Sequence, residues 1–105
     1  MTQSKFFSQG GVLIGFELVG HTGAGRSGKD IVCAAVSSAA CMTANTITEM
    51  YGFSAAVTTS DGLLRVTLSV DDANRCRELL EGFRLHLIEL QKQYPNKIKV
   101  INTEV

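Results

Sequence analysis

The sequence predicts one α+β domain over residues 1–105, with a mainly antiparallel sheet and two helices in the order ββαββαβ. Two glycine-containing turns, Gln9-Gly10-Gly11 and Asp61-Gly62, each separate a pair of strand-like runs. A segment rich in small residues and a segment with an apolar stripe at helical spacing supply the helices. The length of 105 residues, 45% of them apolar, is sufficient for one hydrophobic core.

The first predicted hairpin pairs residues 3–8 with residues 12–19. In the second run, Ile14, Phe16 and Leu18 alternate along the chain and therefore share one face. The opposite face is expected to carry Leu13, Gly15, Glu17 and Val19.

The first predicted helix spans about Asp30 to Met50, and Gly52 ends it. Its alanines, serines and cysteines are small enough for close packing against a sheet. Ser27 and Asp30 have the spacing of a capping box, which satisfies unpaired amides of the first helical turn.

The second predicted hairpin turns at Asp61-Gly62, and its returning strand alternates through Leu64, Val66, Leu68 and Val70 on the buried face. The second helix, from about Asp71 to Tyr94, precedes Pro95. Residues 98–105 then supply a last strand at a sheet edge. The apolar stripe of this helix consists of Ala73, Cys76, Leu80, Phe83, Leu87, Leu90 and Tyr94.

The composition argues against several classes of protein. Ten Lys and Arg residues balance ten Asp and Glu residues, so direct nucleic-acid binding is not expected. No continuous apolar run approaches the roughly 18 residues of a membrane span, and the start of the chain does not resemble a signal peptide. We therefore expect a cytoplasmic protein without a membrane partner. Three cysteines match no zinc pattern, and no cofactor or metal is expected.

The glycine-rich segment from Gly20 to Cys33 allows two interpretations. Gly23 to Lys29 reads G-x-x-x-x-G-K, the first part of a phosphate-binding loop. Asp30 then places a carboxylate where that motif has a magnesium-binding hydroxyl, and its charge would repel phosphate. The sequence therefore disfavours a nucleotide site.

The second interpretation pairs His21 with Cys33 as base and nucleophile. Cys33 lies near a predicted helix start, where the helix dipole favours a thiolate, and Lys29 precedes it by one turn. His21 follows a strand and can reach the thiol if the loop folds back. Glycine amides of the loop are candidate oxyanion donors, and these glycines are Gly23, Gly25 and Gly28.

Gly20-His21, a glycine-bearing loop, and Gly28 to Ser37 with the block DIVCAAVS together resemble the signature of the ribosomal-processing cysteine proteases, the Prp family. The resemblance extends over the whole chain in length and element order. It implies a His21–Cys33 dyad, a homodimer, and a loop that closes over bound peptide. It also implies a substrate, the N-terminal extension of a large-subunit ribosomal protein precursor, which is cut after an aromatic residue.

Two further residues near the proposed dyad each have two possible roles. Asp30 either caps the helix or orients His21 or a basic substrate residue. Ser37, one turn beyond Cys33, either hydrogen-bonds within the site or bonds its own helix backbone. Gly20 belongs to the same motif.

The competing functional hypothesis is a non-catalytic, ribosome-associated binding module in which Cys33 is inert and Arg26 and Lys29 contact anionic groups. A redox sensor based on Cys33 ranks below it. Cys41 and Cys76 are expected to be core thiols, and His86 is expected at a wet or interfacial position. Small residues in the helices and an unpaired last strand also favour a symmetric dimer.

Overall fold

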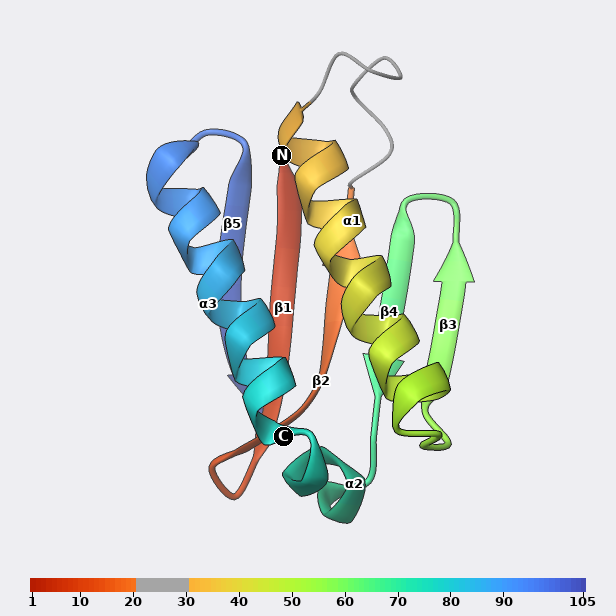
Figure 1. Ribbon diagram of the computed structural model, residues 1–105. Coiled ribbons are helices and arrows are strands. Elements are labelled where there is room, and N and C mark those ends of the chain that lie inside the picture. Colours follow the sequence, from red (N-terminus) through yellow and green to blue (C-terminus); the bar gives the residue numbers. More distant parts are fainter. Residues whose placement is uncertain (21–30) are drawn as a thin grey trace.

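The computed structural model describes residues 1–20 and 31–105, which form a five-stranded sheet in the order β3-β4-β2-β1-β5. Helices α1 and α3 lie over one face of this sheet (Figure 1). The pairing is antiparallel except between β1 and β5, so the predicted α+β class is confirmed. The strands are β1 (Thr2–Gln9), β2 (Val12–Val19), β3 (Ala56–Ser60), β4 (Leu63–Thr67) and β5 (Ile98–Glu104). The helices are α1 (Ile31–Asn45), its π-helical continuation η1 (Thr46–Met50), α2 (Val70–Arg75) and α3 (Arg77–Gln93).

The first hairpin forms where the glycine turn predicts it. Gly10 and Gly11 have φ angles of 59° and 81°, the left-handed conformation that a two-residue hairpin turn requires. Further along, the register shifts, because Phe7 pairs with Gly15 whereas Ser8 pairs with Leu13. This β-bulge interrupts the alternation and turns Leu13 into the core, where it is 3% exposed. The expectation that Leu13 lies on the face opposite Phe16 and Leu18 is therefore wrong.

At Gly15 of β2, the backbone of β4 lies close by. A Cβ atom at this position would overlap the carbonyl oxygen of Val66 and lie 2.9 Å from the Cα of Thr67, so only glycine fits. Elsewhere on the sheet, the Arg65 guanidinium lies 4.9 Å from the centroid of the Phe7 ring and helps to cover that ring.

The core lies between the sheet and the helices. Phe16 of β2 packs edge-on against Phe83 of α3 with 4.8 Å between ring centroids, and Phe6 of β1 completes the cluster at 5.5 Å from Phe83. Leu80 and Leu87 of α3 are fully buried. The predicted apolar stripe thus faces the sheet, as the helical spacing requires.

The first predicted helix begins at Ile31 and continues through η1 to Met50. Gly52, with φ of 73°, follows its end as predicted. Ile47 is fully buried within η1, whose widened turn is closed by the amide of Tyr51 bonding the carbonyl of Thr46 at 3.0 Å. The predicted Ser27–Asp30 capping box lies outside the described residues.

Among the described helices, the continuous segment Ile31–Met50 is the one long and apolar enough to cross a membrane by length and composition, with a mean hydropathy of 1.5. Serines and threonines interrupt its apolar residues, so the segment has no continuous apolar run, but its average hydropathy is still high. One such helix is weak evidence for a span, since core helices pass the same test. Here Val36, Ala40 and Ile47 are fully buried.

The second predicted helix is two helices, because the chain bends at Cys76, whose φ and ψ angles are −122° and 35°. The hydroxyl of Ser69 accepts a hydrogen bond from the amide of Asp72 at 3.2 Å and caps α2. Val70 therefore starts a helix and is exposed, and the prediction that it continues the strand is wrong.

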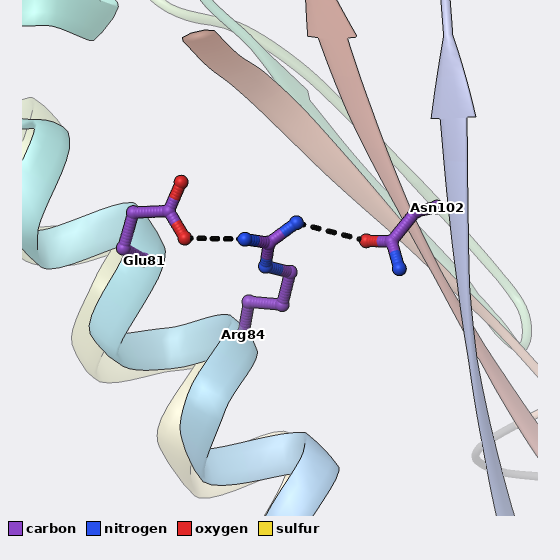
Figure 2. Close-up of polar contacts among 3 residues, drawn as sticks. All are labelled: Glu81, Arg84 and Asn102. Atoms are coloured by element: carbon purple, nitrogen blue, oxygen red, sulfur yellow. Dashed lines mark hydrogen bonds and ion pairs between the residues drawn. The ribbon is translucent and has the colours of Figure 1, made fainter. Parts of the chain in front are cut away.

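Polar contacts connect α3 to the edge strand β5. The guanidinium of Arg84 forms an ion pair with Glu81 at 2.6 Å and donates a hydrogen bond to the side-chain oxygen of Asn102 at 3.1 Å (Figure 2). The side-chain oxygen of Gln91 accepts from the amide of Val100 at 2.6 Å. These contacts hold the predicted last strand beside β1, to which it runs parallel.

Candidate functional site

The candidate site lies at one end of the sheet, where β2 ends and α1 begins (Figure 1). Gly20 follows β2 with a φ angle of 82°, and a Cβ here would lie 3.1 Å from the carbonyl oxygen of Met1. The amide of Gly20 donates a hydrogen bond to the carbonyl of Gly62 at 2.9 Å. The β3–β4 turn is thus attached to the site. Sequence reasoning missed this contact, because the pairing of β2 with the distant β4 leaves no local signal.

Cys33 occupies the first turn of α1. Val32 and Val36, which are 4% and 0% exposed, anchor this part of the helix in the core, whereas Cys33 itself is half-buried. As described, the first turn of α1 holds no acidic side chain. Cys33 therefore lies beside the N-terminal end of α1, where the helix dipole has its positive end.

Ser37 lies on the same side of α1 as Cys33, because four residues separate them. It is also half-buried. The structure therefore brings these two predicted site residues together and positions Gly20 at the same end of the sheet (Figure 1). Five predicted site residues lie outside the described residues, and they are His21, Gly23, Gly25, Gly28 and Asp30.

The remaining cysteines and histidine lie elsewhere. Cys41 is exposed, so its expected place in the core is wrong, because Ala40 takes the sheet-facing position in that turn of α1. Cys76 is fully buried, as predicted. His86 is exposed and lines a groove of about 380 Å³ between α1 and α3, together with Met42. Within residues 1–20 and 31–105, no group of three or more His, Cys, Asp or Glu side chains could hold a metal ion.

Burial raises the pKa of the Cys76 thiol above its ordinary value of 9.0, and the nearby charge of Asp72 raises it further. As the pH rises through about 9, the unfolded thiol therefore ionises before the folded one, and stability is lost. We expect the free energy of unfolding to fall more steeply between pH 8 and pH 10 in the native protein than in a Cys76→Ala variant. Urea unfolding at both pH values measures the difference, and equal slopes would contradict it.

Comparison with known proteins identifies the family of this chain and similar folds. The family model described as cysteine protease Prp matches residues 1–99. The crystal structure of SMU.848 from Streptococcus mutans is 28% identical with a TM-score of 0.88, over 100% of this chain and 96% of that chain. A comparison with curated protein sequences finds no significant match.

Two similar structures are those of the essential ribosomal processing protease Prp from Staphylococcus aureus. The complex with a substrate peptide has 18% identity and a TM-score of 0.86, and the complex with a covalently linked product peptide has 19% identity and a TM-score of 0.87. Each match covers 98% of this chain and 100% of the other. At these identities the likeness establishes the fold. Because the family model covers nearly the whole sequence, this chain belongs to the cysteine protease Prp family.

Proposed function

We propose that this protein is a cysteine endopeptidase that removes an N-terminal extension from a large-subunit ribosomal protein precursor by cutting after an aromatic residue. The observation that carries the proposal is the position of Cys33 in the first turn of α1, within a sequence that the family model matches. The Staphylococcus aureus relative is a ribosomal processing protease that has been seen with a substrate peptide, which supports the choice of substrate.

In the proposed mechanism, His21 takes the thiol proton of Cys33, and the resulting thiolate attacks the scissile carbonyl carbon. Collapse of the tetrahedral intermediate breaks the peptide bond, and His21 returns the proton to the leaving amine. The resulting thioester is hydrolysed when His21 deprotonates a water molecule that attacks the acyl carbon. The thiol then leaves with that proton, and the enzyme is regenerated.

The supporting residues have proposed roles around this dyad. Amides of the glycine-bearing loop, at Gly23, Gly25 and Gly28, are candidate donors to the oxyanion. Asp30 caps α1 or orients His21 or a basic substrate residue, and Ser37 hydrogen-bonds within the site or to its own helix. The loop closes over bound peptide. Gly20 follows β2 in the left-handed conformation and precedes His21 in the sequence.

A direct test exposes a synthetic precursor peptide with one aromatic residue to the protein and identifies the products by mass spectrometry. We expect two fragments with the cut immediately after the aromatic residue. A matched peptide with alanine in its place should be cut much more slowly. An intact precursor after prolonged exposure would contradict the proposal.

Alkylation separates the protease from a binding module with an inert thiol. Ordinary thiols are almost entirely protonated at pH 6, whereas a thiolate held by an imidazolium and a helix start is not. We expect iodoacetamide to modify Cys33 rapidly near pH 6 in a Cys41→Ser background, which removes the exposed thiol of the same helix. A His21→Ala variant should react slowly at this pH. Equally slow reaction of both proteins would favour the binding module.

We also propose a cytoplasmic homodimer. The groove between α1 and α3, lined by Met42 and His86, offers a surface for a second copy. Light scattering at micromolar concentration should give the mass of two chains. A monomeric mass would contradict the dimer without affecting the dyad.

A further inference from the structure

The strand β3 forms one edge of the sheet, and all five of its residues, AVTTS, are exposed. Natural proteins usually protect such an edge with charged residues or proline, because its backbone can pair with another chain. β3 contains neither. The opposite edge, β5, carries Lys99 and Glu104, and the Glu104 carboxylate accepts hydrogen bonds from Ser8 and from the amide of Gly10, each at 3.2 Å. β3 is therefore the edge that is open to pairing.

The direction of the backbone groups of β3 follows from the bonds of its neighbour. Just before β4, the carbonyl of Gly62 accepts a hydrogen bond from the amide of Gly20, which follows β2. Just after β4, the amide of Leu68 donates a hydrogen bond to the carbonyl of Ile14 in β2. Even-numbered residues of this segment therefore turn toward β2, and odd-numbered residues turn toward β3. Arg65, which pairs with Thr58, is one of the odd-numbered residues.

In an antiparallel pair, two directly opposed residues either both point their N–H and C=O groups toward each other or both point them away from each other. Thr58 therefore directs its N–H and C=O groups to β4, as do Ala56 and Ser60. Val57 and Thr59 direct theirs outward from the edge of the sheet. Val57 is 46% exposed although its cross-strand partner Val66 is fully buried, so an apolar surface adjoins these polar groups.

This edge is connected to the candidate site. β3 runs toward the Asp61–Gly62 turn, and that turn bonds Gly20 at the end of β2. Figure 1 shows the turn at the same end of the molecule as the start of α1. Thr59 is thus nearer to that end than Val57.

We propose that β3 binds the polypeptide substrate as an added strand, with hydrogen bonds from the substrate backbone to the outward N–H and C=O groups of Val57 and Thr59. The inference rests on the proposed function for the nature of the ligand, an extended peptide. Cys33 lies in the first turn of α1, at the end of the molecule to which this edge leads, and this continuity favours substrate over a second copy of the chain. Residues of the substrate flanking the scissile bond then lie along β3.

Proline at position 59 tests the inference, because it removes an outward donor without removing a β3–β4 hydrogen bond. In a Cys33→Ala background that prevents turnover, we expect Thr59→Pro to weaken binding of a fluorescent precursor peptide about tenfold. Thr59→Ala, which keeps the amide, should bind within about twofold of the parent. Thr58→Pro removes a donor directed to β4 and should instead lower the melting temperature. Unchanged peptide affinity in Thr59→Pro would overturn the inference.

A second experiment does not depend on the folding of any β3 variant. Precursor peptides, each methylated at one backbone amide, are tested for binding to the Cys33→Ala protein. If the peptide binds as an added strand, methylation at every second amide should weaken binding. Sensitivity without this alternation would overturn the inference. If the native protein binds the peptide with the alternating pattern but never cuts it, the proposed protease function is wrong, whereas the inference that β3 binds a peptide is supported. Loss of dimerisation in Thr59→Pro with unchanged peptide affinity would assign β3 to a second copy.

Discussion

Replacement of Cys33 by alanine should reduce kcat/KM for precursor cleavage by a factor on the order of 10⁴ to 10⁶, because the nucleophile of a covalent mechanism has no substitute. The residue is half-buried in the first turn of α1, and the flanking core side chains Val32 and Val36 are unchanged by the substitution. We therefore expect the variant to fold and to bind the peptide. Steady-state kinetics with the synthetic precursor peptide measures the loss, and circular dichroism checks the fold.

The matched control is Cys41→Ala, which removes an exposed thiol from the same helix. Because Cys41 lies about two turns beyond Cys33, its loss should leave kcat/KM nearly unchanged. Full activity in Cys33→Ala would show that another group attacks the peptide. Equal losses in both variants would indicate damage to α1 instead of loss of a nucleophile.

Phe16→Ala should have the largest effect on stability, lowering the free energy of unfolding by about 3 to 5 kcal/mol. Phe16 is fully buried and contacts both Phe6 of β1 and Phe83 of α3, so truncation leaves a cavity between the sheet and the helix. Since domains of this size are stable by roughly 5 to 15 kcal/mol, the variant should be close to unfolding at 37 °C. Urea denaturation followed by circular dichroism gives the value.

Leu85→Ala is the corresponding control on α3, because Leu85 is 59% exposed. A surface truncation of this kind should change stability by no more than about 0.5 kcal/mol. A loss below about 1 kcal/mol for Phe16→Ala would mean that the aromatic cluster is not the centre of the core.

Much of the fold could be predicted from local patterns. Gly10-Gly11 and Asp61-Gly62 each allow a turn whose conformation few other residue pairs adopt, and both hairpins form there. The apolar stripe of the second helix predicted its buried face. It did not reveal the bend at Cys76, because α2 and α3 both bury residues of that stripe and the periodicity continues across the break.

Features that depend on distant strands could not be predicted. The bulge that turns Leu13 inward depends on how β1 and β2 settle into register beyond Phe7. The close approach at Gly15 depends on β4, which is distant in the sequence. The parallel addition of β5 beside β1 likewise depends on long-range pairing, and nothing in residues 98–105 alone distinguishes parallel from antiparallel pairing.

For the candidate site, the sequence placed the thiol correctly at a helix start but not its surroundings. The motif around Cys33 predicted both the helix and the family, and the family is confirmed. The pairing with His21 stays a prediction, since that residue lies outside the described range. The attachment of the β3–β4 turn to Gly20 has no counterpart in the local sequence, because it is a contact between segments about forty residues apart.

The carbonyl of Met1 adjoins Gly20, while Val105 lies near the opposite end of the molecule (Figure 1). Purification tags, fluorophores or fusion partners joined ahead of Met1 would therefore crowd the region where peptide is expected to enter. The same additions joined after Val105 would project away from it. Immobilisation through the carboxyl end is accordingly the better arrangement for binding and turnover assays.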